Sequence, residues 1–320
     1  MANRKWLGFI ALAVALIVVL GVGLGIGLAS SSEDASPAGG TTDAADNTDP
    51  VAQAADGATA NMEQSEEIIG QFEGVAGVGL EPMPELERPD CTYVTDGETI
   101  YGVDVQSGTV EWIFYGGNLA GREKVLITKE EAQAIATEFA QQHCEFFAIL
   151  TLTTSELVDY YAPFRDAGLP FPVSTTCEYR FEWTQIVDGA TTPNRACVEV
   201  NPGTGQIMSY HCKYQPLESS GSPTVTKEEA VAIVKDRVME RVKDYSSFFA
   251  GLPETWGEPQ VQEVLIKDGP ELKIIVEDGK QYLTWYIQAS AVITGAAPSI
   301  GGDYWIDAGT GEVVRYWSYL

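Results

Sequence analysis

The sequence from Trp305 to Tyr316 reads WIDAGTGEVVRY, and this stretch decides the fold. Aromatic and β-branched residues flank a glycine-rich turn, which is the local pattern of a β-hairpin. The carboxylate of Asp307 can accept hydrogen bonds from backbone N–H groups two residues further on. Gly311 can adopt the positive φ that closes a type I turn between two strands. The stretch therefore predicts two antiparallel strands joined by a tight turn.

The same turn pattern occurs at two earlier places in the chain. Asn201 and Gly205 hold the equivalent positions in NPGTGQI, and Asp104 and Gly108 hold them in DVQSGTV. Each copy reads Asp or Asn, two residues, Ser or Thr, Gly, any residue, and then Val or Ile. We therefore predict a hairpin turn at all three places.

A second repeated pattern marks the start of a helix. The sequence ITKEEA begins at Ile127, and VTKEEA begins 98 residues later. In each copy a threonine precedes the helix and a glutamate follows three residues on, which is a capping box: Thr128 with Glu131, and Thr226 with Glu229. The acidic residues also lie at the positive end of the helix dipole. A capped helix, strands and an Asx-Gly hairpin thus form a unit that occurs twice.

These signatures resemble the PepSY family, including its tandem-repeat relatives in bacterial envelope proteins. The helix openings at Thr128 and Thr226 and the turns at Asn201 and Asp307 carry the resemblance, which covers roughly residues 91–320. It implies an α+β fold of two tandem small domains, each with one helix packed on an antiparallel sheet. The family also occurs in propeptides of thermolysin-type proteases, which implies a protein-binding or peptidase-regulating role. It brings no catalytic residue and no cofactor, so we assign none.

The charge of the chain argues against nucleic acid as a partner. There are 46 acidic residues against 19 basic ones, for a net charge of −27. Phosphate contacts need a basic face, so nucleic-acid binding is not expected. The excess is partly local, because residues 30–90 hold 14 acidic residues and one basic residue, Arg88. A solvated tail explains that part without an acid-binding ligand.

The N-terminal residues predict a membrane anchor. We expect residues 1–5, with Arg4 and Lys5, to be cytoplasmic and the uncharged residues 6–28 to form a transmembrane helix. Residues 29–61 would be a disordered acidic linker that holds extracytoplasmic domains away from the membrane. A cleavable signal peptide is the alternative, since small residues follow the apolar run, although its apolar region is usually only about 7–15 residues long.

The rest of the chain divides into three segments. Residues 62–122 form an N-terminal segment with a hairpin, which is either a partial third repeat or an addition to the sheet of the first full repeat. Residues 123–217 form the first PepSY-like domain, and residues 218–320 form the second. Within the first, residues 177–183 alternate strictly between apolar and polar positions from Cys177 on, as a half-buried antiparallel strand does.

The five cysteines allow disulfides or a metal site. An extracytoplasmic location permits disulfides, and we take Cys91, Cys177, Cys197 and Cys212 as candidates without assigning their connectivity. Cys144 is predicted to lie in the core as the leftover thiol. The pairs His143-Cys144 and His211-Cys212 have the residue types of a zinc site. Adjacent residues point in different directions on a helix or strand, however, so we expect no metal.

No catalytic motif is found: the sequence has no HExxH, GxSxG or P-loop pattern. Acidic residues at the helix starts are explained by capping. The expected function is therefore that of a non-catalytic, single-pass membrane protein that binds another protein, an envelope protein or a protease. The alternatives are an extracytoplasmic enzyme with an unrecognised site and a structural surface spacer.

Overall fold

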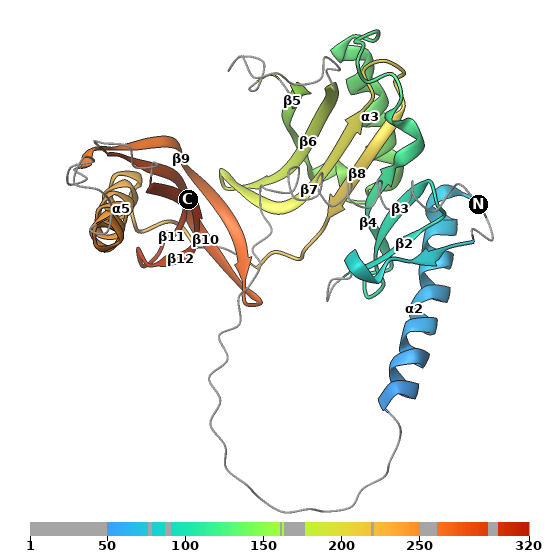
Figure 1. Cartoon of the computed structure of the whole chain (residues 1–320), viewed down its shortest axis with the longest axis horizontal. Coiled ribbons are helices and arrows are strands. Elements are labelled where there is room, and N and C mark those ends of the chain that lie inside the picture. The colour runs from blue at the N-terminus through green and yellow to red at the C-terminus, as the bar shows by residue number, and fades with distance from the viewer. Residues whose placement is uncertain are drawn as a thin grey trace, which may run out of the picture. The chain divides into compact units, whose positions relative to one another are not determined.

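The computed structural model describes residues 50–75, 79–86, 91–160, 162, 177–218, 221–249, 261–293 and 300–319. The expected membrane helix at residues 6–28 lies outside them. Within the described ranges, no helix combines the length and the apolar character needed to cross a membrane. The fold is a mixed α+β fold that is mostly sheet (Figure 1), as the sequence predicts. The helices are α2 (Pro50–Glu73), α3 (Lys129–His143) and α5 (Lys227–Phe249), with short 3-10 turns η1 (Pro84–Leu86), η2 (Gly116–Leu119) and η3 (Phe147–Ile149).

The strands follow each helix in blocks. After α2 come β1 (Glu81–Pro82), β2 (Thr92–Thr95), β3 (Thr99–Asp104) and β4 (Thr109–Tyr115). After α3 come β5 (Thr151–Asp159), β6 (Cys177–Val187), β7 (Ala190–Val200) and β8 (Ile207–Lys213). After α5 come β9 (Val261–Glu277), β10 (Lys280–Ile293), β11 (Ile300–Asp307) and β12 (Val313–Tyr319).

Both predicted capping boxes are present. The Glu131 N–H donates to Thr128 Oγ1 at 3.2 Å, and Glu131 Oε2 accepts from the Thr128 N–H at 2.8 Å. The copy at Thr226 and Glu229 has the same two bonds, at 3.3 and 2.8 Å. These backbone hydrogen bonds hold the pKa of both glutamates below its ordinary value. Each box provides hydrogen-bond acceptors for two backbone N–H groups at the start of the helix, which is why both helices begin there.

The three predicted turns also form. Asp307 Oδ1 accepts from the Gly309 and Thr310 N–H groups at 2.7 and 2.8 Å. Asp104 Oδ1 accepts from the N–H groups of the equivalent residues, and Asn201 Oδ1 accepts from the Gly203 N–H at 2.9 Å. The closing glycines have positive φ, as expected: Gly108 at 72°, Gly205 at 78° and Gly311 at 80°.

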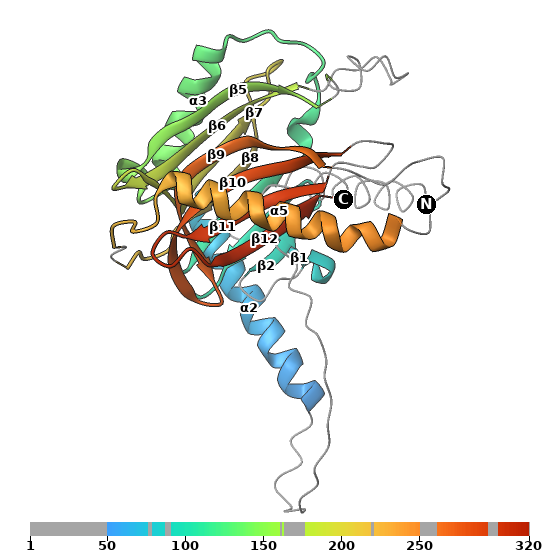
Figure 2. The same cartoon turned by 90° about the vertical axis from the view of Figure 1, so that its left-hand side faces the viewer.

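Each full repeat is a helix followed by four antiparallel strands. In the first, neighbouring strands run in the order β5-β6-β7-β8, and in the second in the order β9-β10-β11-β12. The turn with the Asp or Asn joins the last two strands in both. Figure 2 shows α5 lying across the strands of the second repeat. Thr191 of β7 also pairs with Lys273 of β9 in parallel.

The N-terminal hairpin extends the sheet of the first repeat. Trp112 of β4 pairs with His211 of β8, and Ile113 pairs with Tyr210. Its own order is a helix, α2, and then strands with the Asp104 turn between the last two. This order matches that of a full repeat, with a first strand, β1, of only two residues. Because β4 pairs with β8, the hairpin adds to the sheet of the first full repeat.

Two apolar cores lie under the capped helices. In the first, Ala132, Ala136 and Ala140 form the buried stripe of α3 against strand residues such as Phe181 and Tyr210, all fully buried. Small alanines let the helix approach the sheet closely, and large side chains from the strands fill the layer. In the second, Val234 and Val238 of α5 face the sheet, packed against Ile287, Tyr304 and Ile306.

Two expectations are corrected by the structure. Residues 50–61, expected in the disordered linker, are helical, because Pro50 suits the first turn of a helix and alanine and glutamine favour its continuation. Helix α2 ends at Glu73, where Gly74 takes a φ of 69°. The sequence Asp268-Gly269-Pro270 is typical of a turn between short strands, but in the structure it forms an irregularity inside the continuous strand β9.

Candidate functional site

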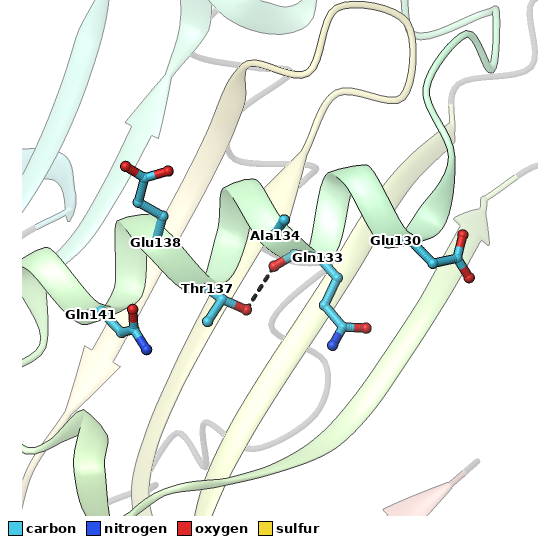
Figure 3. Close-up of a pocket in the computed structure, with 6 residues that line it drawn as sticks. All are labelled: Glu130, Gln133, Ala134, Thr137, Glu138 and Gln141. Atoms are coloured by element: carbon cyan, nitrogen blue, oxygen red, sulfur yellow. Dashed lines mark hydrogen bonds between the residues drawn. The ribbon is translucent and has the colours of Figure 1, made fainter.

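A shallow groove runs along the outer face of α3 (Figure 3). Its volume is about 440 Å³. The lining positions recur every three or four residues, so they form one stripe beside the buried alanine stripe. The stripe is Glu130, Gln133, Ala134, Thr137, Glu138 and Gln141. Thr137 Oγ1 donates to the Gln133 carbonyl at 2.7 Å, which turns that hydroxyl back onto its own helix. Most of its lining residues are polar, and the groove is open to solvent.

The groove lies beside an edge strand. Lys129 Nζ donates to the Ser155 carbonyl of β5 at 3.3 Å, and Ser155 Oγ donates to Gln133 Oε1 at 3.4 Å. Gln133 thus lines the groove and also contacts β5. Among the described residues, β5 pairs with β6 alone. One side of β5 therefore presents backbone N–H and C=O groups without a strand partner, which is the feature that accepts an added strand.

The charge of this region is negative. Glu130 and Glu138 are the ionisable residues of the groove lining, and β5 carries Glu156 and Asp159. A basic residue, Lys129, lies at the start of α3, where it contacts the Ser155 carbonyl. The net charge of the whole chain, −27, has the same sign. An extended segment that carries lysine or arginine complements this region.

A buried ion cluster lies on the opposite face of the same sheet. Strand side chains alternate, so Tyr179 and Phe181 face the core while Glu178 and Arg180 face away from it. Arg180 Nη2 donates to Glu178 Oε1 at 3.0 Å and to Glu199 Oε1 at 2.9 Å.

Three further residues complete this cluster. Arg122 Nη2 donates to Glu178 Oε2 at 3.2 Å, and the Tyr160 hydroxyl donates to Glu178 Oε1. Ser209 Oγ donates to Glu199 Oε2 at 2.6 Å. The positive charges of two arginines thus neutralise the negative charges of two glutamates.

The ion cluster is closed to solvent at its centre. The Glu178 side chain is 4% exposed, and burial raises its pKa to about 7, with the neighbouring Glu199 adding to the rise. A carboxyl group with such a pKa can exchange a proton near neutral pH. A substrate would have no access to it, because its oxygens are already bonded to Tyr160, Arg122 and Arg180. We therefore treat the cluster as structural and place the candidate site at the groove.

The second repeat has different chemistry on the corresponding face of its sheet. There Asp303 Oδ1 accepts from the Tyr286 hydroxyl at 2.9 Å and from Gln288 Nε2 at 3.2 Å. Lys273 Nζ lies 3.7 Å from the centroid of the Tyr286 ring. The same fold thus carries an arginine–glutamate cluster in one repeat and an aromatic–amide–carboxylate cluster in the other. The repeats share a backbone pattern and have diverged on this face.

No disulfide joins the five cysteines, all of which lie in the described ranges. Register explains why Cys197 and Cys212 do not bridge each other. Cys197 pairs with His211, and Cys212 pairs with Ala196, so the two thiols point to opposite faces of the sheet. The candidates Cys91 and Cys177 also lie elsewhere in the sheet, before β2 and at the start of β6. Cys144 is buried in the core, as predicted.

The two histidines lie on opposite faces of the first sheet. The His143 ring stacks on Phe72 of α2, with centroids 4.0 Å apart, on the face that α3 covers. His211 lies between Tyr210 and Cys212, which both face that core, so its own side chain points the other way. In the described part of the chain, no group of three or more His, Cys, Asp or Glu side chains is arranged to hold a metal ion.

Together these features define a class: a repeat protein of α+β domains, each with a capped helix on a four-stranded antiparallel sheet. Residues 114–214 match the model of a family described as the YcdB, YcdC repeated domain. This range begins in β4 and includes α3 and all of β5–β8. The word "repeated" in that description agrees with the duplication seen here.

A search of curated proteins found no match. The C-terminal domain of Bacillus megaterium YpeB is similar at 14% identity and a TM-score of 0.37, over 81% of this chain and 97% of that one. PepSY is named in neither match, so that resemblance stays a prediction.

Proposed function

We propose that this protein is a non-catalytic binding protein that captures an extended segment of a partner protein on β5, beside the groove of α3. The observation that carries the proposal is the position of the groove next to the unpaired side of β5. An added strand obtains its affinity from main-chain hydrogen bonds and its specificity from pockets for alternate side chains. Here the backbone of β5 supplies the main-chain hydrogen bonds, and the stripe from Glu130 to Gln141 supplies the contacts to side chains.

The negative charges of the groove indicate which kind of partner segment would bind there. Glu130 and Glu138 lie two turns apart on one helix face, so a strand that runs along α3 passes both. Basic side chains spaced along the strand would pair with them. The partner is therefore a protein with an extended basic segment. Following the PepSY resemblance, we favour an envelope protein, and among envelope proteins a peptidase.

Binding of model peptides tests this proposal. The probe is a fluorescein-labelled nonapeptide of alternating threonine and lysine, and its counterpart has glutamate for lysine. By fluorescence anisotropy we expect saturable binding of the lysine peptide and about tenfold weaker binding of the glutamate peptide. The double variant E130Q/E138Q should bind the lysine peptide about threefold to tenfold more weakly, because exposed ion pairs contribute roughly 0.2–1 kcal/mol each.

The second repeat offers a matched control. Glu228 and Asp236 hold the positions on α5 that Glu130 and Glu138 hold on α3, 98 residues earlier. The variant E228Q/D236N removes the same charge and should leave binding unchanged. Equal loss in both double variants, or no binding of either peptide, would overturn the proposal. Capture of an envelope peptidase by the wild type and not by E130Q/E138Q would identify the partner class; equal capture by both would exclude the groove.

We also propose that residues 6–28 anchor the protein in the membrane, with the folded domains extracytoplasmic. The length of this uncharged segment and the basic residues before it support the proposal. After alkaline carbonate extraction, the full-length chain should stay in the membrane pellet, and a chain that begins at residue 50 should be in the supernatant. Protease added to intact spheroplasts should digest the domains. Release of the full-length chain by carbonate, or protection of the domains, would contradict the anchor or its orientation.

A further inference from the structure

Two buried thiols face each other at the end of α3. Cys144 follows the last residue of α3, where its N–H donates to the Ala140 carbonyl at 2.9 Å. Cys212 lies one residue before the end of β8. Both side chains belong to the first core, 3% and 9% exposed, and each thiol shifts the pKa of the other, lowering that of Cys144 and raising that of Cys212. The sequence did not predict this pair, since it left Cys144 as the unpaired thiol.

An independent contact holds the two segments together. The ring of Phe146, two residues after Cys144, lies 4.9 Å from the ring of Tyr214, two residues after Cys212. The Cys144 carbonyl also accepts from the Phe147 N–H at 3.0 Å, which fixes the turn that follows α3. The approach of the two sulfur atoms is therefore set by the backbone on both sides.

The other cysteines are unsuitable partners for Cys212. Cys197 points to the opposite face of the sheet, as its register with His211 shows. Cys91 lies beside Gly102 and Trp112, on that same opposite face. Cys177 is six residues along β6 from Trp183, the residue level with Cys212 across the sheet, and this places it roughly 20 Å away at about 3.4 Å per residue.

We propose that Cys144 and Cys212 form an intramolecular disulfide when the chain folds in an oxidising environment. With glutathione disulfide as oxidant, the Cys144 thiolate attacks one sulfur, forms a mixed disulfide and releases one glutathione thiolate. The Cys212 thiolate then attacks the Cys144 sulfur and releases the second glutathione. Two protein thiols are oxidised to one disulfide, glutathione disulfide is reduced to two glutathione molecules, and these take up the two protons lost by the cysteines.

The mixed disulfide needs more space than the closed core offers, so the reaction belongs to folding and not to the folded state. The finished bond would tie the end of α3 to β8.

Refolding under two redox conditions tests the proposal. Full-length protein in mild detergent is refolded from urea, either with oxidised and reduced glutathione or with dithiothreitol alone. After oxidised refolding we expect a mass lower by two hydrogen atoms and a peptide map that links Cys144 to Cys212. The Tm should be higher than in dithiothreitol by about 5–10 °C, since the bond closes a long loop.

Serine variants separate this pair from the other cysteines. C197S should keep the redox difference in Tm, while C144S and C212S should lose it. If a variant fails to fold, the peptide map of the wild type still decides. Alkylation of all five cysteines after oxidised refolding, or a link between any other two, would overturn the proposal.

Discussion

Replacing Arg180 with methionine is expected to lower the free energy of unfolding by about 3–5 kcal/mol at pH 8. Arg180 lies between Glu178 and Glu199 and donates to both, at 3.0 and 2.9 Å. Methionine has a similar length and no charge, so the change leaves two carboxylates close together in a half-buried site. Arg122 still contacts Glu178, but at 3.2 Å it neutralises one of the two.

The loss should depend on pH in a defined direction. The pKa of Glu178 is already raised to about 7 by burial, and without Arg180 it rises further. An acid with a raised folded-state pKa holds its proton in the native state, so stability is kept at low pH and falls as pH rises through that pKa. The destabilisation by R180M should therefore be smaller at pH 5 than at pH 8.

Urea denaturation at the two pH values measures the effect. The control is R237M, which breaks the Arg237–Glu240 pair on the surface of α5, where both side chains are more than half exposed. Such pairs contribute roughly 0–1 kcal/mol, so this variant should stay close to wild type at both pH values. If R180M lost no more unfolding free energy than R237M, the ion cluster would contribute no more to stability than a surface ion pair.

Replacing Asn201 with aspartate is expected to lower the free energy of unfolding by about 3 kcal/mol or more. Asn201 is fully buried, and its Nδ2 donates to the carbonyls of Asn118 and Ala120 at 2.7 and 2.8 Å. Aspartate would lose both donors and put a carboxylate oxygen against two carbonyl oxygens. Its Oδ1 could still accept from the Gly203 N–H, so the local turn itself would survive.

The other full repeat supplies the reciprocal substitution. Asp307 holds the same turn position, but both of its side-chain bonds, from the Gly309 and Thr310 N–H groups, are exposed. An asparagine oxygen can accept both, so D307N should change stability by less than about 1 kcal/mol. Thermal and urea unfolding of the two variants give the comparison. Equal small losses would show that the loop at Asn118 and Ala120 adapts to a charge.

The capped helices and Asx turns could be predicted because their interactions are local. Thr128 and Glu131 are three residues apart, and Asp307 bonds to backbone two and three residues on. The alternation from Cys177 to Trp183 likewise predicted which side chains enter the core, since a strand has a period of two. Helix α2 was only partly predicted, because residues 50–61 hold few large apolar side chains that could form an apolar stripe.

The position of the groove beside β5, the ion cluster and the thiol pair could not be predicted, because each joins residues far apart in the chain. Arg122, Tyr160, Glu178 and Glu199 meet around Arg180 only when β6 and β7 pair in one register. Cys144 and Cys212 share one core only when α3 docks on the sheet that contains β8. A shift of the register by one residue would send Glu178 and Arg180 into the core and separate both clusters.

Asn201 and Asp307 show which properties of a turn follow from local sequence and which follow from tertiary contacts. The residue type at both positions is enough to predict a turn, because either side chain can accept the same local N–H bonds. The need for an amide at Asn201 follows from long-range contacts alone. The 118–120 loop covers it and presents two carbonyl oxygens, whereas the side-chain hydrogen bonds of Asp307 are exposed to water. The geometry of each turn follows from neighbouring residues in the chain. The requirement for a hydrogen-bond donor at Asn201 follows from the two carbonyl groups that the fold packs against its side chain.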